Sequence, residues 1–397
     1  MIRKIERYFK FSERNTNWIT ELRAGFATYL TMAYILFVNP VILKDAGVPF
    51  NACVVGTALA AGLTSIIMGI VANFPLALAA GMGLNSVLTY SIVIGQGVSW
   101  QVGMGLIFIN GLIVFILVLV GLREAVMNAI PVPLRHAIAV GIGMFLAYIG
   151  LMHAGIVIID RNTLLPSPGN FSEISTIISC CGILITAVFV ALRIKGAIIG
   201  GILITAFLSF LAGLSKLPAT INTLDFSTVG ALDVVGALKL SLIPSLFAFI
   251  IVDFFDTLGT VTAIGYQAKL VDSQGSIEKL KAILGIDAIG AMLGGFFGSS
   301  SNTSYIESAA GIMEGGRTGI TAIVVGVLFL LSIVIAPVAS MITSQATAPA
   351  LVIIGFLMMQ AITQIDFEQL DTAIPAFVII LAMPFTYSIS HGIGYGF

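Results

Sequence analysis

Three carboxylate side chains lie within strongly apolar parts of the sequence. Asp253 and Asp256 stand three residues apart in LFAFIIVDFFDTLGTVTAIG, a spacing that places both on one face of a helix, and Glu307 lies in SSSNTSYIESAAGI. Ionisable side chains inside apolar helices are costly and are candidates for function by default. Two neighbouring carboxyl groups repel each other when both are ionised, so the Asp pair is expected to share a proton, as proton coupling requires. The alternative is a structural role in which hydrogen bonds to these carboxyl groups fix helix packing.

A run of polar residues, 299–304, precedes Glu307. Lipid does not tolerate such a run unless it lines a cavity or points into protein. Glu307 is therefore expected to accept hydrogen bonds from the N–H groups of a neutral ligand. Thr303 and Tyr305 flank the same position, and the Tyr305 ring could stack on a flat ligand. The alternative for Glu307 is a capping acid at the start of its own helix.

A third segment, AAGMGLNSVLTY, carries two glycines and an asparagine. Gly81 and Gly83 permit close backbone approach, and Asn85 offers both a donor and an acceptor to a planar heteroatom edge. Helix packing through small residues is the alternative interpretation of the glycines. The three histidines show no metal-ligand spacing, so the sequence predicts neither a metal nor a cofactor.

The composition predicts the environment of these residues. Of 397 residues, 9% are charged and 58% are hydrophobic, and the mean hydropathy is +1.09. A soluble chain carries about 25% charged residues, so this one is expected to be embedded in lipid. A net charge of −1 leaves no basic surface for nucleic acid, and three cysteines in apolar runs do not form a disulfide scaffold.

The hydropathy pattern predicts an all-α polytopic membrane protein. A spanning helix needs about 20 mostly apolar residues. The third and tenth spans are short and contain Gly, Pro or Ser-rich stretches, which predicts short extended segments within them. The thirteen predicted spans cover 23–43, 52–72, 78–94, 101–120, 134–152, 174–192, 196–214, 241–263, 282–297, 303–315, 319–341, 348–363 and 373–390.

Basic residues predict the orientation. If the first span runs outward, 14 of the 18 Lys and Arg residues lie on the inner side and 4 on the outer side. Lys and Arg concentrate in cytoplasmic loops. Residues 1–22 are therefore expected to form a cytoplasmic N-terminal arm of a multi-pass protein in the plasma (inner) membrane.

The chain also repeats its organisation. A shift of 222 positions lays the first predicted span on the eighth and the interrupted stretch at Asn85 on the one at Glu307. Seven spans per repeat is an odd number, so the first repeat (23–214) and the second (241–397) must enter the membrane from opposite sides. Inverted repeats with interrupted helices at matching positions are typical of secondary transporters with a site near the midplane. A fourteenth span is expected, and the ending SHGIGYGF suggests that it is truncated.

These motifs resemble the xanthine/uracil permease superfamily, and within it the adenine, guanine and hypoxanthine permeases. The resemblance runs through TELRAGFATYLTMAYILFVNP, AAGMGLNSVLTY, VDFFDTLGTVTAIG and SSSNTSYIESAAGIMEGGRTG. It implies fourteen spans in two inverted repeats, with a core domain of spans 1–4 and 8–11 and a gate domain of spans 5–7 and 12 onward. It also implies proton-coupled purine import, a possible homodimer through the gate, and roles in substrate recognition and transport for Asn85, Asp253, Asp256 and Glu307.

Together these observations predict a transporter that imports purine nucleobases with protons by alternating access. The substrate is expected to contact Gly83, Asn85, Asp253, Asp256, Thr303, Tyr305 and Glu307, with Asp253, Asp256 and Glu307 carrying the proton. One alternative is an anion carrier or channel of the same architecture, although carboxylates repel anions. Another is an intramembrane aspartyl enzyme, which would place its two Asp on facing helices. The preferred purine and the choice between proton and sodium stay open.

Overall fold

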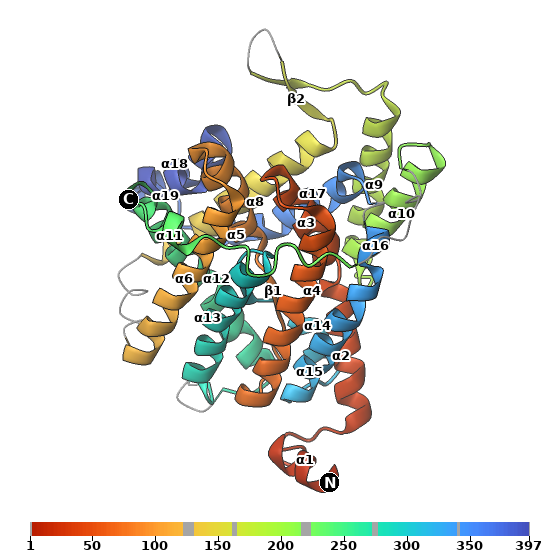
Figure 1. Ribbon diagram of the computed structural model, residues 1–397, viewed down its shortest axis with the longest axis vertical. Helices are drawn as coiled ribbons and strands as arrows, with labels where there is room; N and C mark the ends of the chain where they lie inside the picture. Colours follow the sequence, from red (N-terminus) through yellow and green to blue (C-terminus); the bar gives the residue numbers. More distant parts are fainter. Residues whose placement is uncertain are drawn as a thin grey trace.

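The computed structural model describes residues 2–121, 131–160, 165–215, 224–271, 277–339 and 342–396. Arg123, Arg161 and Lys216, three of the basic residues that predict the orientation, lie outside these ranges. The described part is a bundle of helices (Figure 1), with α1 and the N-terminus at the bottom of the view and the β2 hairpin at the top. The apolar composition therefore folds into helices, which satisfy the backbone hydrogen bonds within each segment.

The first half of the chain begins with a short helix, α1 (Ile2–Tyr8), and supplies the first seven predicted spans. A hairpin of β2 (Val157–Ile159) and β3 (Pro166–Pro168) follows the fifth span. The elements of the spans are α2 (Trp18–Met32) with α3 (Ile35–Asp45), α4 (Phe50–Ile67) with the π-helix η1 (Met68–Ala72), β1 (Leu78–Ala80) with α5 (Met82–Ser86) and the π-helix η2 (Val87–Ile94), α6 (Trp100–Val120), α8 (Val132–His153), α9 (Ile174–Ala191) and α10 (Ala197–Leu211).

The second half supplies the remaining spans in the same order. Short helices α11 (Val234–Ala237) and η3 (Leu240–Leu242) precede the first of these spans. Its elements are α12 (Ile243–Gln267), α13 (Leu280–Phe297), β4 (Asn302–Ser304) with α14 (Ser308–Met313), α15 (Gly319–Leu331) with η4 (Ser332–Ile335) and α16 (Ala336–Ala339), α17 (Ser344–Met359) with η5 (Gln360–Gln364), α18 (Leu370–Thr386) and α19 (Ile389–Gly396).

Each of the thirteen predicted spans overlaps one of these helical or interrupted segments. Within the described residues, seven helices are long and apolar enough to cross a membrane by themselves, and five shorter apolar helices accompany them. The first span starts at Trp18 rather than at residue 23, because Asn17 caps the helix by accepting a hydrogen bond from the Thr20 amide. The protein is therefore a multi-pass membrane protein.

The two interrupted spans meet each other as a small antiparallel sheet. Strands β1 and β4 pair with Leu78 opposite Ser304 and Ala80 opposite Asn302. Two further bonds extend this pairing, from the Gly81 amide to the Ser301 carbonyl at 2.9 Å and from the Tyr305 amide to the Ala77 carbonyl at 3.0 Å. An extended backbone away from water must find such partners. The extended segments predicted in the third and tenth spans are confirmed. Each segment supplies hydrogen-bond partners for the backbone of the other.

The helices form two packing groups. One group, here called the first group, consists of α2, α3, α4, α6, α12, α13, α14 and α15, which pack chiefly against one another, together with β1, α5 and β4 of the two interrupted spans. The second group consists of α8, α9, α10, α17, α18 and α19. These are the elements that the resemblance assigns to the core and the gate. The division into two domains that move relative to each other stays a prediction.

Glycines bring helices of the first group into close contact. A Cβ built at Gly326 of α15 would lie 2.5 Å from the Gly62 carbonyl oxygen of α4. By contrast, a Cβ at Gly285 of α13 would meet only the Phe115 ring, at 3.7 Å. Backbone contact between α4 and α15 therefore depends on the missing side chain at Gly326, whereas Gly285 has room for a methyl group.

We expect Gly326→Ala to destabilise the protein by about 1–3 kcal/mol, because the added methyl group overpacks the contact between α4 and α15. Gly285→Ala is the matched control, since it gains the same helix propensity without a clash, and it is expected to be neutral or stabilising. The measurement is thermal unfolding of both purified variants in detergent. Equal unfolding temperatures for the two variants would contradict this account of the packing.

Candidate functional site

A cavity of about 640 Å³ lies between the two helix groups. This volume falls in the range of sites that bind small molecules. The first group lines it with Tyr34, residues 81–84, residues 303–307 and three residues of α12 (Val252, Asp256 and Thr260), and the second group lines it with Arg135, His136, Ile138, Ala139, Ile142, Ile354, Met358 and Ala361. The residues that follow both short strands therefore share one cavity with α8 and α17.

Glu307 reaches this cavity from the position before α14. Its side chain makes no capping hydrogen bond to its own helix. Instead, the Tyr34 hydroxyl donates a hydrogen bond of 2.6 Å to Glu307 Oε1. The geometry thus does not support the capping role considered as the alternative, and Tyr34 is a site residue that sequence reasoning missed.

The two aspartates of α12 do not occupy equivalent positions. Asp256 is exposed to the cavity and hydrogen-bonds to Thr303, whereas Asp253 is fully buried and is not among the lining residues. The acids that act on Asp256 electrostatically are Asp287 and Glu307. Of the predicted pair, Asp256 therefore lines the cavity, whereas Asp253 lies within the protein. A shared role of the two in proton coupling stays a prediction. The acids near the ligand position are Asp256 and Glu307, with Asp287 behind them.

Asp287 of α13 anchors strand β4 from behind the cavity. The Ser304 amide and hydroxyl donate to Asp287 Oδ1 at 3.1 and 2.9 Å, and the Thr257 hydroxyl donates to Oδ2 at 2.6 Å. The hydroxyls of Thr257 and Thr303 lie 3.2 Å apart. A chain of polar contacts therefore runs from Asp256 through the two threonines to Asp287. The signal that could have found Asp287 is a lone acid in the apolar stretch KAILGIDAIGAMLGG.

Asn85 is buried behind the cavity. Its amide nitrogen donates to Asn39 Oδ1 at 2.6 Å, and Asn39 in turn donates to the Thr57 hydroxyl at 2.8 Å and to the Ser299 carbonyl at 2.9 Å. The structure thus places Asn85 in a link between spans 1, 2 and 3 and the polar run before β4. Sequence reasoning also missed Asn39, which connects these segments.

Gly83 and Tyr305 come from the two interrupted spans. Both line the cavity. A Cβ at Gly83 would lie 3.1 Å from Ile142 Cγ2, so the glycine lets the start of α5 approach α8 of the second group. The Tyr305 hydroxyl donates to the Ala80 carbonyl at 2.5 Å, which fixes its ring against β1. Of the predicted residues, Gly83, Asp256, Thr303, Tyr305 and Glu307 therefore meet at the cavity, and Asn85 and Asp253 do not.

The cavity offers three kinds of contact to a ligand. The carboxyl groups of Asp256 and Glu307 accept hydrogen bonds, and amides of the first turn of α5 lack partners within their own helix and can donate. Apolar side chains of α8 and α17 supply a nonpolar wall. Among the described residues there is no group of three His, Cys, Asp or Glu side chains that could hold a metal ion.

Known structures share this architecture. The transmembrane domain of the cyanobacterial bicarbonate transporter BicA superposes with a TM-score of 0.69 at 14% identity, covering 94% of this chain and 96% of that domain. SLC26A9 superposes with a TM-score of 0.70 at 11% identity, covering 95% and 64% of the two chains. At such low identity the likeness concerns the fold alone, which is the inverted-repeat fold of seven plus seven spans.

Relatives in sequence are permeases. A putative permease of Methanocaldococcus jannaschii is 44% identical over 99% of this chain and 91% of its own length. The adenine permease AdeP of Escherichia coli is 39% identical (99% and 88% covered), and the guanine/hypoxanthine permease PbuG of Bacillus subtilis is 37% identical (98% and 91% covered). Residues 20–394 match the model of a family described as the Permease family. The chain therefore belongs to this family, that of the xanthine and uracil permeases.

Proposed function

We propose that this protein transports purine nucleobases across the membrane through the cavity between its two helix groups. The observation that carries this proposal is the cavity itself, in which Asp256 and Glu307 share the lining with apolar side chains of α8 and α17 and with Arg135 and His136 of α8. The relatives support the substrate class, because their names describe adenine and guanine/hypoxanthine permeases. The role is that of a carrier rather than an enzyme.

The chemistry of a purine matches the cavity walls. A purine is a flat ring with N–H groups and ring nitrogens at its edge, so it needs acceptors, donors and a nonpolar surface. Glu307, held by Tyr34, accepts a ring N–H, and Asp256 is a second acceptor. Amides at the start of α5, next to Gly83, donate to a ring nitrogen or carbonyl. Tyr305 and the apolar side chains pack against the ring faces.

Proton coupling is the second part of the proposal. Asp256 and Glu307 are carboxyl groups inside a largely apolar cavity, and Asp287 adds a third acid behind Asp256. Protonation of one carboxyl group relieves their mutual repulsion and favours the loaded carrier. A proton driven inward gains about 2.3 kcal/mol for each 100 mV of membrane potential. This coupling supplies the energy for uptake against a concentration gradient. Asp253, which is buried nearby, is a further acid expected to influence the proton coupling.

Alternating access is the third part. The cavity is lined by both helix groups, so a movement of one group against the other changes which side of the membrane it opens to. In this proposal the first group is the core that carries the site, the second group is the gate, and the N-terminus lies in the cytoplasm. The protein resides in the plasma (inner) membrane, and dimerisation occurs through the gate.

We expect Glu307→Gln to lower the initial rate of radiolabelled adenine or hypoxanthine uptake about 10- to 100-fold, because a hydrogen bond to a charged acceptor is lost. Uptake is measured in cells that lack their own purine permeases, with the amount of membrane protein determined for each variant. Glu368→Gln, at an exposed glutamate between η5 and α18, is the control and is expected to transport at the normal rate.

The same assay tests the driving ion. An acidic medium is expected to speed uptake and a protonophore to abolish its concentrative phase, whereas Asp256→Asn should lose the pH dependence. Uptake that ignores both the protonophore and the Glu307 substitution would overturn the proposal. Uptake driven by a sodium gradient would overturn proton coupling but not purine transport. Competition by bicarbonate or sulfate, with none by purines, would favour the anion carrier.

We expect Asp287→Ala to destabilise the protein more than Asp287→Asn. The alanine leaves the Ser304 amide, the Ser304 hydroxyl and the Thr257 hydroxyl without their acceptor, at about 1–3 kcal/mol for each buried group. Asparagine removes the same charge but keeps a carbonyl oxygen for Ser304. Thermal unfolding of the purified variants measures the difference. If both variants unfold at the same temperature, Asp287 does not anchor β4 through these bonds.

A further inference from the structure

The N-terminal arm, residues 2–17, is docked against the first helix group. The Tyr8 hydroxyl donates to the Ile70 carbonyl at 2.5 Å, next to the end of the second span. Phe9 and Phe11 are buried with Ile320 of α15 in a small apolar cluster. These contacts hold the arm over the ends of several spans, at the face of the protein that is here called the arm face.

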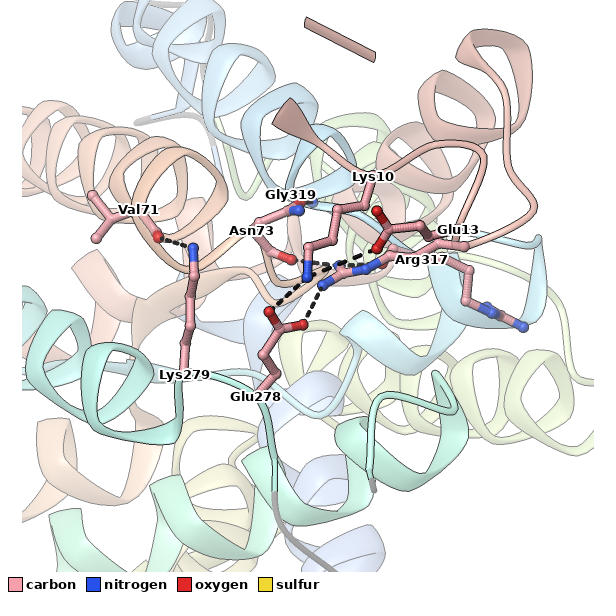
Figure 2. Close-up of polar contacts among 9 residues, drawn as sticks. Lys10, Glu13, Val71, Asn73, Glu278, Lys279, Arg317 and Gly319 are labelled. Carbon is pink, nitrogen blue, oxygen red and sulfur yellow. Dashed lines mark hydrogen bonds and ion pairs between the residues drawn. The ribbon is translucent and has the colours of Figure 1, made fainter. Parts of the chain in front are cut away.

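Arg14 of the docked arm has a side chain that is only 9% exposed. The residues that it contacts, Asn73, Glu278 and Arg317, come together at the arm face (Figure 2). Arg14 Nη1 donates to two backbone carbonyls, that of Asn73 at 2.6 Å and that of Arg317 at 2.9 Å. Its Nη2 lies 3.4 Å from Glu278 Oε2. A guanidinium group can serve three acceptors at once because its five donors form a rigid planar fork.

The two carbonyls belong to the arm-face ends of the two interrupted spans. Asn73 opens the extended segment that leads to β1, in a left-handed conformation (φ 52°) that asparagine tolerates better than most residues. Its side-chain oxygen accepts a hydrogen bond of 2.8 Å from the amide of Gly319, where α15 begins. Asn73 is thereby fixed through both its backbone and its side chain.

Arg317 follows α14, on the other interrupted span. Its Nη1 donates to the Ile312 carbonyl in the last turn of that helix at 2.7 Å. Its amide donates to Oε1 of buried Glu21 at 2.9 Å. The hydrogen bond from Arg14 to the Arg317 carbonyl therefore helps to fix the position of α14.

The same two spans are also joined within the protein by the pairing of β1 with β4. The Ala77 amide donates to the Ser308 hydroxyl at 3.0 Å, between that pairing and the arm face. Each interrupted span is thus held twice, once by the strand pair and once by Arg14. The cavity-lining residues 81–84 lie directly after β1, and the lining stretch 303–307 begins within β4.

We propose that Arg14 is a positioning residue for the cavity. It joins the arm-face ends of both interrupted spans through their carbonyls, and so keeps the two cavity-lining stretches in register. The effect on transport rests on the proposed function, but the effect on the two spans does not. The contacts that carry the role are those to Asn73 and Arg317, because these are the contacts that reach both spans.

The ion pairs around Arg14 are expected to matter less. Hydrogen bonding from Lys10 lowers the pKa of Glu278, whose carboxylate is therefore ionised at neutral pH. Both Lys10 and Glu278 are largely solvent-exposed (36% and 50%). Exposed pairs contribute little to stability, so the Glu278 charge is a suitable control for the charge of Arg14.

The test compares Arg14→Lys with Glu278→Gln in the full-length protein. Lysine keeps the charge, but its side chain is shorter and lacks the rigid planar fork of the guanidinium group, so it is not expected to reach both carbonyls from the same backbone position. Hydrogen–deuterium exchange is measured on peptides covering 74–85 and 302–313. Arg14→Lys is expected to speed exchange in both peptides, and Glu278→Gln in neither. Arg14→Gln, which can still donate to one carbonyl, serves as a second variant.

Uptake kinetics provide the second readout. We expect Arg14→Lys to raise KM for the purine about ten-fold, as for the loss of one charged hydrogen bond, with a smaller change in the maximal rate per molecule. Glu278→Gln should leave KM unchanged. A purely structural role would lower the amount of folded protein without moving KM.

Each outcome decides between the possibilities. Unchanged exchange in both peptides for Arg14→Lys overturns the proposal, and so does failure of both Arg14 variants to fold when Glu278→Gln folds, since that assigns Arg14 to folding alone. If the unmodified protein takes up no purine, the proposed function fails, while the exchange experiment still decides the role of Arg14. Faster exchange with an unchanged KM would show that Arg14 holds the two interrupted spans without positioning the cavity, and would overturn the role in the cavity.

Discussion

Two interrupted spans meet inside this protein through the backbone of β1 and β4, and the site depends on that pairing. An extended backbone cannot stand unpaired away from water, so each strand is possible only because the other satisfies its N–H and C=O groups. The strand from the first half of the chain thereby comes to lie beside the strand from the second half. Residues 81–84, which follow β1, and residues 303–307, which begin within β4, then line one cavity. A contact between two repeats that are more than 200 positions apart thus creates the site.

The acids around this strand pair lie in two kinds of surroundings. Asp287 holds β4 from behind by accepting bonds from Ser304 and Thr257, while Asp256 and Glu307 face the cavity. The cost of placing carboxyl groups in an apolar interior is offset where donors surround them, as they do at Asp287. Fewer protein donors meet the groups at the cavity, which leaves them able to bind a ligand N–H or a proton. In the proposed function, the same residue type therefore serves structure on one side of the strand pair and recognition on the other.

The surroundings of the strand pair constrain it from two directions. Within the protein, the Asn39 and Asn85 amides connect the first three spans to the polar run before β4. At the arm face, Arg14 joins the carbonyls at the ends of the two interrupted spans. The first helix group is consequently joined internally by polar contacts at several depths.

Much of this protein follows from its sequence alone. Scarce charge and apolar segments of spanning length dictate a multi-pass helical protein, because lipid excludes unpaired backbone. Polar or glycine-rich interruptions at matching positions predicted the extended segments and the residues Gly83, Asp256, Thr303, Tyr305 and Glu307, since few polar groups survive in such spans without a reason. Only the tertiary structure decided that Asp253 and Asn85 lie behind the cavity, and that Tyr34, Asn39 and Asp287 complete its surroundings. Periodicity tells which face of a helix a side chain occupies, but the partner of that face depends on contacts between segments far apart in the chain.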